Sequence, residues 1–211
     1  MIEYLFSNPT LFLIWAMALL TAIAVHEFAH ALVADKLGDP TPKLEGRLTL
    51  NPIAHLDPIG TLMILFFRFG WGKPVRIDPF NLKDPRKDQA LIALAGPASS
   101  LLTAAVFALI LKLLLQTNLA SPFLLLGLLS PFIILNIGLA VFNLLPLHPL
   151  DGGKILVGIL PKETAQQFDQ FLGQYGLIIL LLLLLPVFGG SLLMQIIVPP
   201  INFLINLFLP Y

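Results

Sequence analysis

The chain contains no cysteine and little charge. Of its 211 residues, 12 are Lys or Arg and 12 are Asp or Glu, so the formal net charge is zero and 11% of the residues are charged. Without thiols there is no disulfide framework and no thiolate metal site, so any metal ion must be held by nitrogen and oxygen atoms. A zero net charge gives no indication of nucleic acid or another polyanion as a partner. Soluble domains contain about 25% charged residues, so the composition also excludes an ordinary soluble domain.

What the chain has instead is apolar sequence. Hydrophobic residues make up 57% of it, and its mean hydropathy is +0.91. Several apolar runs reach the roughly 20 residues that a helix needs to cross a lipid bilayer. Residues 10–34, 90–115 and 122–145 are the clearest of these runs. The sequence therefore predicts an all-α polytopic membrane protein.

Shorter segments complete this prediction. Residues 59–69 are apolar but too few to span a bilayer, so we expect a re-entrant segment there. Residues 44–50 and 72–77 alternate with period two, which predicts a small membrane-associated β-hairpin that either holds an extended substrate or is only structural. Residues 162–172 are amphipathic and predict an interfacial helix. Residues 176–209 form either two short spans meeting at residues 189–190 or one span followed by an interfacial helix. We expect about five membrane segments in one domain, residues 1–211.

The basic residues predict the orientation of this domain. All but Lys112 fall on one side if residues 59–69 do not cross the membrane. The positive-inside rule then places this side in the cytoplasm and the N-terminus outside. The first apolar run lacks a basic start and is too long for a signal peptide, so we expect a retained helix. These features are typical of a prokaryotic plasma membrane, and the polar motifs described next fall toward its cytoplasmic face.

Residues 26–30 read His-Glu-Phe-Ala-His, the H-E-x-x-H signature of zinc hydrolases. In an α-helix, positions i and i+4 share one face, so His26 and His30 can bind one ion. Glu27 lies about 100° further round the helix, where its carboxylate can take a proton from water instead of binding the metal. The pattern predicts a Zn²⁺ site with Glu27 as the base. The alternative is a helix whose polar residues only hydrogen-bond to a neighbouring helix.

A catalytic zinc keeps three protein ligands and one open position, so a third ligand is needed. We prefer Asp151, because it lies at the same predicted depth as His30 and because Gly152 and Gly153 give its segment backbone freedom. A helix N-cap is the alternative role for Asp151. His148 is a rival ligand, but two prolines hold it in an extended segment. The other candidates are His55, Asp57, Asp78, Glu163 and Asp169.

Five motifs occur in the chain in a fixed order: HEFAH at 26–30, NPIAHLDPIG at 51–60, GWGKPV at 70–75, AGP at 95–97 and NLLPLHPLDGG at 143–153. Over about residues 10–160 the chain thus resembles the site-2 protease family of intramembrane zinc metalloproteases. By that resemblance, His26, His30 and Asp151 are the zinc ligands and Glu27 is the catalytic base. Asn143 matches the family asparagine that assists at the scissile peptide.

The resemblance implies a zinc-dependent endopeptidase that cleaves single-span transmembrane proteins within or near the membrane, as in regulated intramembrane proteolysis. The chain resembles the compact form of the family, without PDZ or CBS domains. It departs from the family at Ser99 and Ser100, where an asparagine is common. Two other functions stay open: an intramembrane metal-ion transporter and a catalytically inactive relative that binds helices. The sequence does not indicate the oligomeric state, the substrate or the role of His55.

Overall fold

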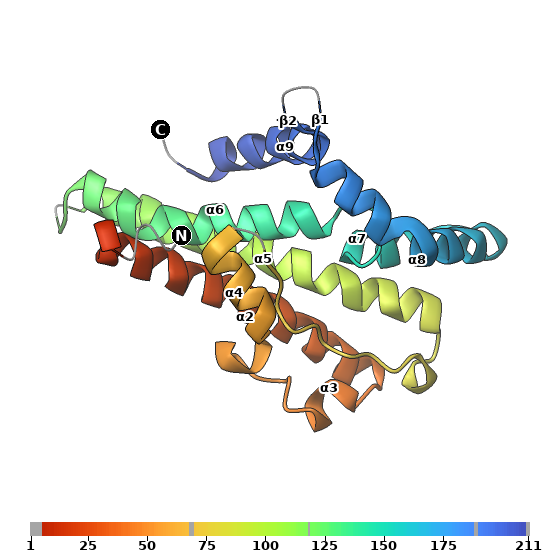
Figure 1. Ribbon diagram of the computed structural model, residues 1–211. Coiled ribbons are helices and arrows are strands. Elements are labelled where there is room, and N and C mark those ends of the chain that lie inside the picture. Colours follow the sequence, from red (N-terminus) through yellow and green to blue (C-terminus); the bar gives the residue numbers. More distant parts are fainter. Residues whose placement is uncertain (1–5, 68–69, 118, 188–189, 210–211) are drawn as a thin grey trace.

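A computed structural model describes residues 6–67, 70–117, 119–187 and 190–209, and within them the protein is almost wholly helical (Figure 1). The α-helices are α2 (Pro9–Leu37), α3 (Thr41–Leu44), α4 (Pro58–Phe67), α5 (Pro85–Leu115), α6 (Pro122–Asn143), α7 (Asp151–Ile159), α8 (Lys162–Leu184) and α9 (Leu192–Phe208). Two 3₁₀ turns, η1 (Pro52–His55) and η2 (Pro79–Asn81), lie in the loops between them.

The three central helices begin with the same local signal. Asn8, Asp84 and Ser121 each accept a backbone N–H of the first turn of α2, α5 and α6, and a proline follows each of them. Such a side chain satisfies an N–H that has no partner within the helix, while proline needs no partner for its nitrogen. Gly38 ends α2 in the left-handed conformation, with φ of 106°. The boundaries of these helices therefore follow from local sequence.

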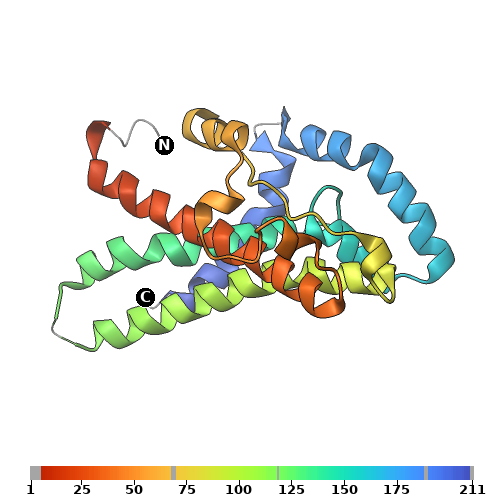
Figure 2. The ribbon, with the colours of Figure 1, turned by 90° about the horizontal axis from the view of Figure 1, so that it is seen from below.

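Helices α2, α5 and α6 lie side by side and form the core of the molecule (Figures 1 and 2). Fully buried alanines, such as Ala18 of α2 and Ala104 of α5, let the helices of this core approach one another closely. Further along, Leu111, Ile133 and Ile137 fill the contact between α5 and α6. The helical core thus holds α2, which bears the H-E-x-x-H residues, against two long neighbours.

The C-terminal helices extend this core. Helix α7 packs on α5 and on α8, and α9 packs on α6. Leu150, Leu180, Leu193 and Ile197 form a second buried cluster where these elements meet. Seen from below, α8 arcs away from the other helices (Figure 2). Helix α7 and the loop before it are therefore fixed between the central helices and α8.

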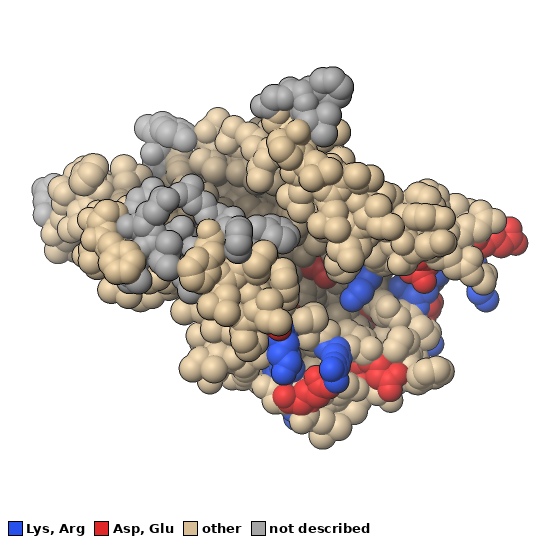
Figure 3. Space-filling view, viewed as in Figure 1, with Lys and Arg blue, Asp and Glu red and all other residues tan. Residues whose placement is uncertain are grey.

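Four helices of the described chain, α2, α5, α6 and α8, are long and apolar enough to cross a membrane, and α9 is a shorter apolar helix of 17 residues. The expectation of a polytopic helical membrane protein is confirmed. Figure 3 shows the charged side chains of one face gathered around α3 and the neighbouring ends of α5, α7 and α8, with an uncharged surface elsewhere. This uneven distribution leaves a broad apolar surface that suits contact with lipid.

The predicted β-hairpin of residues 44–50 and 72–77 is wrong. Leu44 ends α3, Gly46 adopts a positive φ of 71°, and the Arg47 N–H donates to the Pro42 carbonyl, so the chain turns there. A period-two pattern predicts a strand only when a second strand pairs with it. Residues 70–77 are extended, and their bridge pairs Gly72 with Leu56 instead. A two-stranded pair does occur elsewhere in the described chain, between β1 (Pro186–Val187) and β2 (Gly190–Ser191), which join α8 to α9.

Two expectations for the C-terminal third also change. The predicted interfacial helix of residues 162–172 continues without a break to Leu184 as α8, because no Pro or Gly pair interrupts it. Of the two readings of residues 176–209, the structure favours two helical segments separated near residue 190, although Gly189 lies outside the described residues. Pro199 and Pro200 fall within α9 and do not divide it. Helix α4 has 10 residues, in agreement with a segment too short to span.

Candidate metal centre

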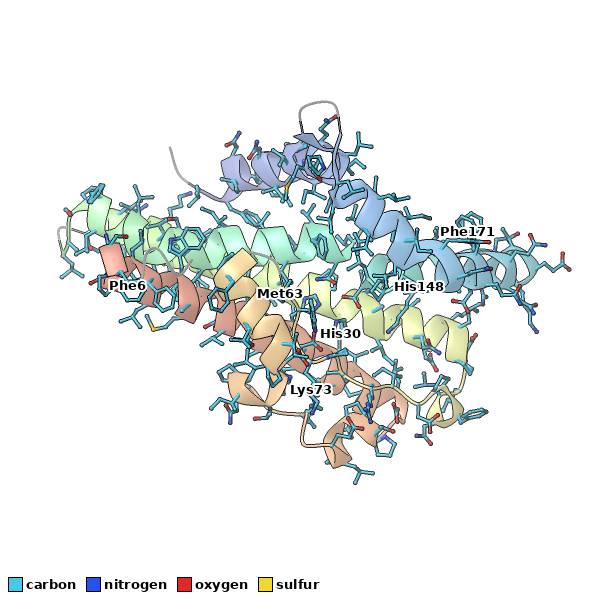
Figure 4. The ribbon with its side chains drawn as sticks, in the orientation of Figure 1. Phe6, His30, Met63, Lys73, His148 and Phe171 are labelled. Carbon is cyan, nitrogen blue, oxygen red and sulfur yellow. The ribbon has the colours of Figure 1, made fainter. Side chains whose placement is uncertain are left out.

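Two histidines and an aspartate converge where α2 meets the start of α7. The Nε2 atoms of His26 and His30 each lie 3.2 Å from Oδ2 of Asp151. One ligand atom from each side chain lies within 4.8 Å of the other two, and both histidines are buried. Figure 4 shows His30 near the centre of the molecule, where the central helices and the extended segment meet. Residues 125 positions apart in sequence thus form one cluster.

Gly96 on α5 makes room for this cluster. A Cβ atom at this position would lie 2.3 Å from Nε2 of His30 and 2.6 Å from Nε2 of His26. Real Cβ contacts are never this short, so any larger residue would displace the imidazoles. Gly96 therefore permits the close approach of α5 to α2, and what it admits is the pair of histidine rings.

The other nitrogen of each imidazole is bonded to α5. Nδ1 of His30 donates to the carbonyl of Ile92 over 2.7 Å, and Nδ1 of His26 lies 3.0 Å from the hydroxyl of Ser100. Because a carbonyl only accepts, Nδ1 of His30 carries the proton and the neutral ring presents its Nε2 lone pair to the cluster. Partners of this kind orient metal-binding histidines. Ser100 was missed as a site residue; its only signal in the sequence was the departure from the family asparagine.

The donor set fits a metal cation. Each Nε2 atom lies 3.2 Å from Oδ2 of Asp151, and nitrogen and oxygen lone pairs at this distance repel unless a proton or a cation lies between them. Asp151 supplies the oxygen atom of this donor set. Two imidazoles and one carboxylate form a common ligand set of catalytic zinc.

Glu27 lies beside this cluster, in contact with the extended segment of residues 70–77. Its Oε2 accepts the backbone N–H of Val75 over 3.2 Å. A cavity of about 380 Å³ opens next to the cluster, and Glu27, Val75 and Asp151 are among the residues that line it. The cavity is mostly apolar, so the few polar groups that enter it can orient a bound molecule.

Asn143, at the end of α6, and Lys154, on α7, both line this cavity, and the loop before α7 lies between them in the sequence. The Asn143 amide donates to the carbonyl of Leu139 over 3.0 Å, and its second N–H remains for another partner. Lys154 lies one helical turn beyond Asp151 and was not predicted from sequence. Its spacing of three residues from Asp151 on a helix was the signal that could have found it.

The comparisons with known proteins agree with this geometry. The profile of Peptidase family M50 matches residues 116–185, a segment that contains Asn143 and Asp151. YwhC of Bacillus subtilis (strain 168), named as a candidate zinc metalloprotease, is 38% identical over 187 residues, which are 84% of this chain and 82% of YwhC. The chain belongs to peptidase family M50. The resemblance to the site-2 proteases, based on five motifs, is confirmed, and this M50 chain is a member of a zinc metalloprotease family.

Two more distant relatives carry similar names. The M50 chain is 30% identical to Rip2 of Mycobacterium tuberculosis (strain ATCC 25618 / H37Rv), another candidate zinc metalloprotease, over 77% of this chain and 62% of Rip2. It is 29% identical to zinc metalloprotease MJ0392 of Methanocaldococcus jannaschii over 74% of this chain and 37% of that protein. It therefore spans less than two thirds of either relative. No solved structure matches the chain significantly.

The remaining histidines of the M50 chain lie away from the cluster. His55 is fully buried, and its Nε2 donates to the carbonyl of Thr49 over 2.8 Å. His148 bonds to Asp169 of α8 over 3.0 Å and lies apart from His30 in Figure 4. Among the described residues, the one His and carboxylate group close enough to hold a metal is His26, His30 and Asp151. Of the candidate third ligands, the structure brings only Asp151 to the two histidines.

The two glycines after Asp151 have a different role from the one expected. Asp151 begins α7 directly, so it lies in a helix and not in an unwound segment, and the N-cap position is Leu150. Neither Gly152 nor Gly153 has a positive φ. A Cβ at Gly152 would lie 2.2 Å from the Leu145 carbonyl oxygen. The glycines therefore allow α7 to pack against the chain that precedes it, which places the Asp151 carboxylate at the histidines.

Proposed function

We propose that the protein is a zinc-dependent endopeptidase that cleaves transmembrane-helix substrates within or near the membrane. The observation that carries the proposal is the convergence of His26, His30 and Asp151 beside a cavity inside a bundle of membrane-length helices. Family membership supports the hydrolytic class. A metal transporter would need polar groups in series across the bilayer, whereas these three residues form one compact cluster.

The proposed ligands are His26, His30 and Asp151. Helix α5 holds both imidazoles through Ile92 and Ser100, so Nε2 is the atom that each ring offers. When bound, Zn²⁺ would supply Lewis-acid chemistry, polarising the scissile carbonyl and making water acidic near neutral pH. Three protein ligands would leave a fourth coordination position for water, as a catalytic site requires.

Glu27 is the proposed general base. Its carboxylate lines the cavity and is oriented by the Val75 N–H. There it can accept a proton from the attacking water and later donate that proton to the leaving amine. Because Val75 holds one carboxylate oxygen, the other oxygen remains available for this exchange.

Asn143 is the proposed substrate-positioning group. It lies at the end of α6 and lines the cavity together with Asp151. The N–H that is not bonded to Leu139 can donate to a substrate carbonyl or to the oxyanion that develops during attack. This places a neutral donor where negative charge appears during peptide hydrolysis.

The membrane supplies the setting for this chemistry. We propose that residues 1–211 form one integral membrane domain in a prokaryotic plasma membrane, with the metal centre toward the cytoplasm. The clustering of charge at one end of the helices supports this orientation (Figure 3). A transmembrane helix satisfies all of its peptide groups internally, so a single-span substrate must unwind locally before one of its peptide bonds reaches the cavity.

The test is cleavage of a single-span reporter by purified, zinc-loaded protein. Glu27→Gln should lower the turnover by at least roughly 100-fold and retain the metal, because the substitution removes the base but no ligand. Asp151→Asn should lower both the turnover and the bound zinc, which is measured by elemental analysis. Asp35→Asn is the matched control, because it removes a carboxylate from α2 whose one side-chain contact among the described residues is an ion pair with Lys43 at 4.0 Å.

Each substitution addresses a separate part of the proposal. Turnover that survives Glu27→Gln would contradict the role of the base. Full zinc occupancy in Asp151→Asn would remove Asp151 from the ligand set. A folded, zinc-loaded wild-type protein that binds reporters without cleaving them would favour an inactive relative.

A further inference from the structure

A second cavity, of about 350 Å³, adjoins the metal-site cavity. Gln89 and Lys154 line both cavities, so the two meet at these side chains. The second cavity lies between the first turn of α5, helix α7 and the first turns of α8. Figure 3 shows basic side chains beside the hollow on this face. A chain that enters the metal-site cavity therefore reaches side chains that also line the second one.

Positive charge dominates this second cavity. Arg86, Lys154 and Lys162 line it, against a single carboxylate, that of Asp169. The Asp169 carboxylate is already bonded to His148. Neither Lys154 nor Lys162 has an ion pair with any of the described residues. Two ammonium groups thus face a cavity with a single carboxylate, one oxygen of which is bonded to His148.

The floor of this cavity is held firmly. The Arg86 guanidinium donates to carbonyls at the C-terminal end of α7, those of Val157, Gly158 and Leu160. A Cβ at Gly158 would lie 2.2 Å from the Cβ of Ala90, so α7 and α5 are in direct contact there. Arg86 is therefore occupied as a structural link, and Lys154 and Lys162 are the groups left to bind a ligand.

We propose that this cavity, the lysine pocket, binds a carboxylate side chain of the substrate. The inference rests on the proposed protease function and adds a sequence preference to it. The lysine pocket lies where the charged ends of the helices gather, so it meets the substrate flank that leaves the membrane. An Asp or Glu inside the bilayer would be costly, whereas one on this flank is not. Lysine binds such a group as a point charge with flexible reach.

The geometry also limits where the acidic residue lies. From Asp151 to Val157 the helix rises by about 9 Å, at ~1.5 Å per residue. An extended substrate covers about 3.3 Å per residue. An acidic residue roughly two to four positions from the scissile bond therefore reaches Lys154 or Lys162, and one much further away does not.

The experiment places a single Glu or Gln at each of the first six positions of the emerging flank of a single-span reporter. The ratio of kcat/KM for the Glu and Gln reporters is measured for the wild type, Lys154→Gln, Lys162→Gln and the double variant. We expect a ratio of roughly three to ten at two to four positions from the bond and about one at the sixth. The double variant should bring the ratio to about one, and added salt should lower it in the wild type.

Lys83→Gln is the matched control, because Lys83 is exposed, lies outside the lysine pocket and should keep the ratio. Cleaved Gln reporters test the protease function alone, so a ratio of one on cleaved reporters would overturn only the lysine pocket. If no reporter is cleaved, the affinities of fluorescent Glu and Gln reporters for the Glu27→Gln variant test the lysine pocket. Equal affinities would overturn the inference. A preference seen in zwitterionic micelles but lost in anionic vesicles would assign the pocket to lipid headgroups instead.

Discussion

The protein buries polar side chains in two neighbouring regions that use them in opposite ways. In the metal centre, on α2, α5 and α7, buried His26 and His30 direct ring nitrogens toward another side chain, Asp151. In the loop region of residues 38–82, buried Asp39 and His55 direct their polar atoms toward the loops around them. Burial alone therefore does not separate a site from a scaffold.

The loop region shows what the second use achieves. The buried Arg47 guanidinium donates to the carbonyls of Ala54 and Lys73, and the Lys73 N–H donates to the His55 carbonyl. These contacts tie the extended segment that bears Val75 to the rest of the loops. Ring nitrogens and a carboxylate that converge on one point call for a cation, whereas polar groups that bond one by one to the loops around them hold those loops together. The predictions below test this distinction.

The largest expected effect comes from filling the space beside the histidines. Gly96→Ala places a methyl group 2.3 Å from Nε2 of His30, so the rings must move and zinc affinity should fall by roughly 100-fold or more. Competition with a chelator measures this affinity. Gly138→Ala is the matched control, because that position on α6 has nothing within 4 Å of a new Cβ. Unchanged zinc affinity in Gly96→Ala would mean that the cluster is not the metal site.

A smaller effect should follow from loosening one imidazole. Ser100→Ala removes the partner of Nδ1 of His26 and should weaken zinc binding by about 10-fold to 100-fold. Ser99→Ala removes a hydroxyl one residue away that bonds to the carbonyls of Gly96 and Val25 but to neither imidazole, so it should change the affinity little. If both variants bind zinc equally well, the Ser100 hydroxyl does not position the ring.

The difference between these two serines shows where sequence reasoning stopped. Periodicity and local signals predicted α2, α5 and α6 to within a few residues, because those helices are set by apolar runs and capping residues. The spacing of His26 and His30 placed them on one helical face. Both serines bond to α2, Ser99 to a backbone carbonyl and Ser100 to the imidazole of His26. Nothing in the local sequence indicates which of the two bonds to the ring, since that depends on how the two helices pack.

Long-range packing also decided the elements that were predicted incorrectly. The alternation of residues 44–50 predicted a strand, but the buried Arg47 and the turn at Gly46 hold this segment to other loops. The position of Asp151 also depends on long-range packing. In the sequence, Asp151 was preferred to the other acidic residues as third ligand because of its predicted depth in the membrane. Its contact with two histidines follows from the packing of α7 against α5 and against its own preceding loop.

His55 and His148 test the other side of the comparison. His55→Ala removes a buried side chain and its bond to Thr49, so it should reduce the free energy of unfolding by about 2–4 kcal/mol. His148→Ala should reduce it by about 0–1 kcal/mol, because its partner Asp169 is mostly exposed. The fraction of each variant that folds should bind zinc with the affinity of the wild type. Loss of zinc from folded His55→Ala would place His55 in the metal centre.

A smaller effect than that of His55→Ala concerns Asp39, which links the end of α2 to the loops. Its buried carboxylate accepts the hydroxyl and N–H of Thr41, the N–H of Asp78 and the amide of Asn81. Burial raises the pKa of Asp39, but these four hydrogen bonds outweigh it and lower the pKa below its ordinary value of 3.8. The carboxylate therefore stabilises the fold fully above that ordinary value, and its contribution is lost as the pH falls through the lower folded value.

Asp39→Asn should accordingly destabilise the protein by about 1–2 kcal/mol at neutral pH. The difference in free energy of unfolding from the wild type should shrink below about pH 4. Thermal unfolding of the metal-free wild type and of metal-free Asp39→Asn, followed from pH 7 down to pH 3, measures this difference. Titratable groups that the two proteins share contribute equally to both and cancel. Because Asp39 acts on backbone and neutral groups of the loops, zinc affinity at neutral pH should stay the same. A parallel loss of zinc would show that the loop region and the metal centre are not separable, and would end the distinction between them.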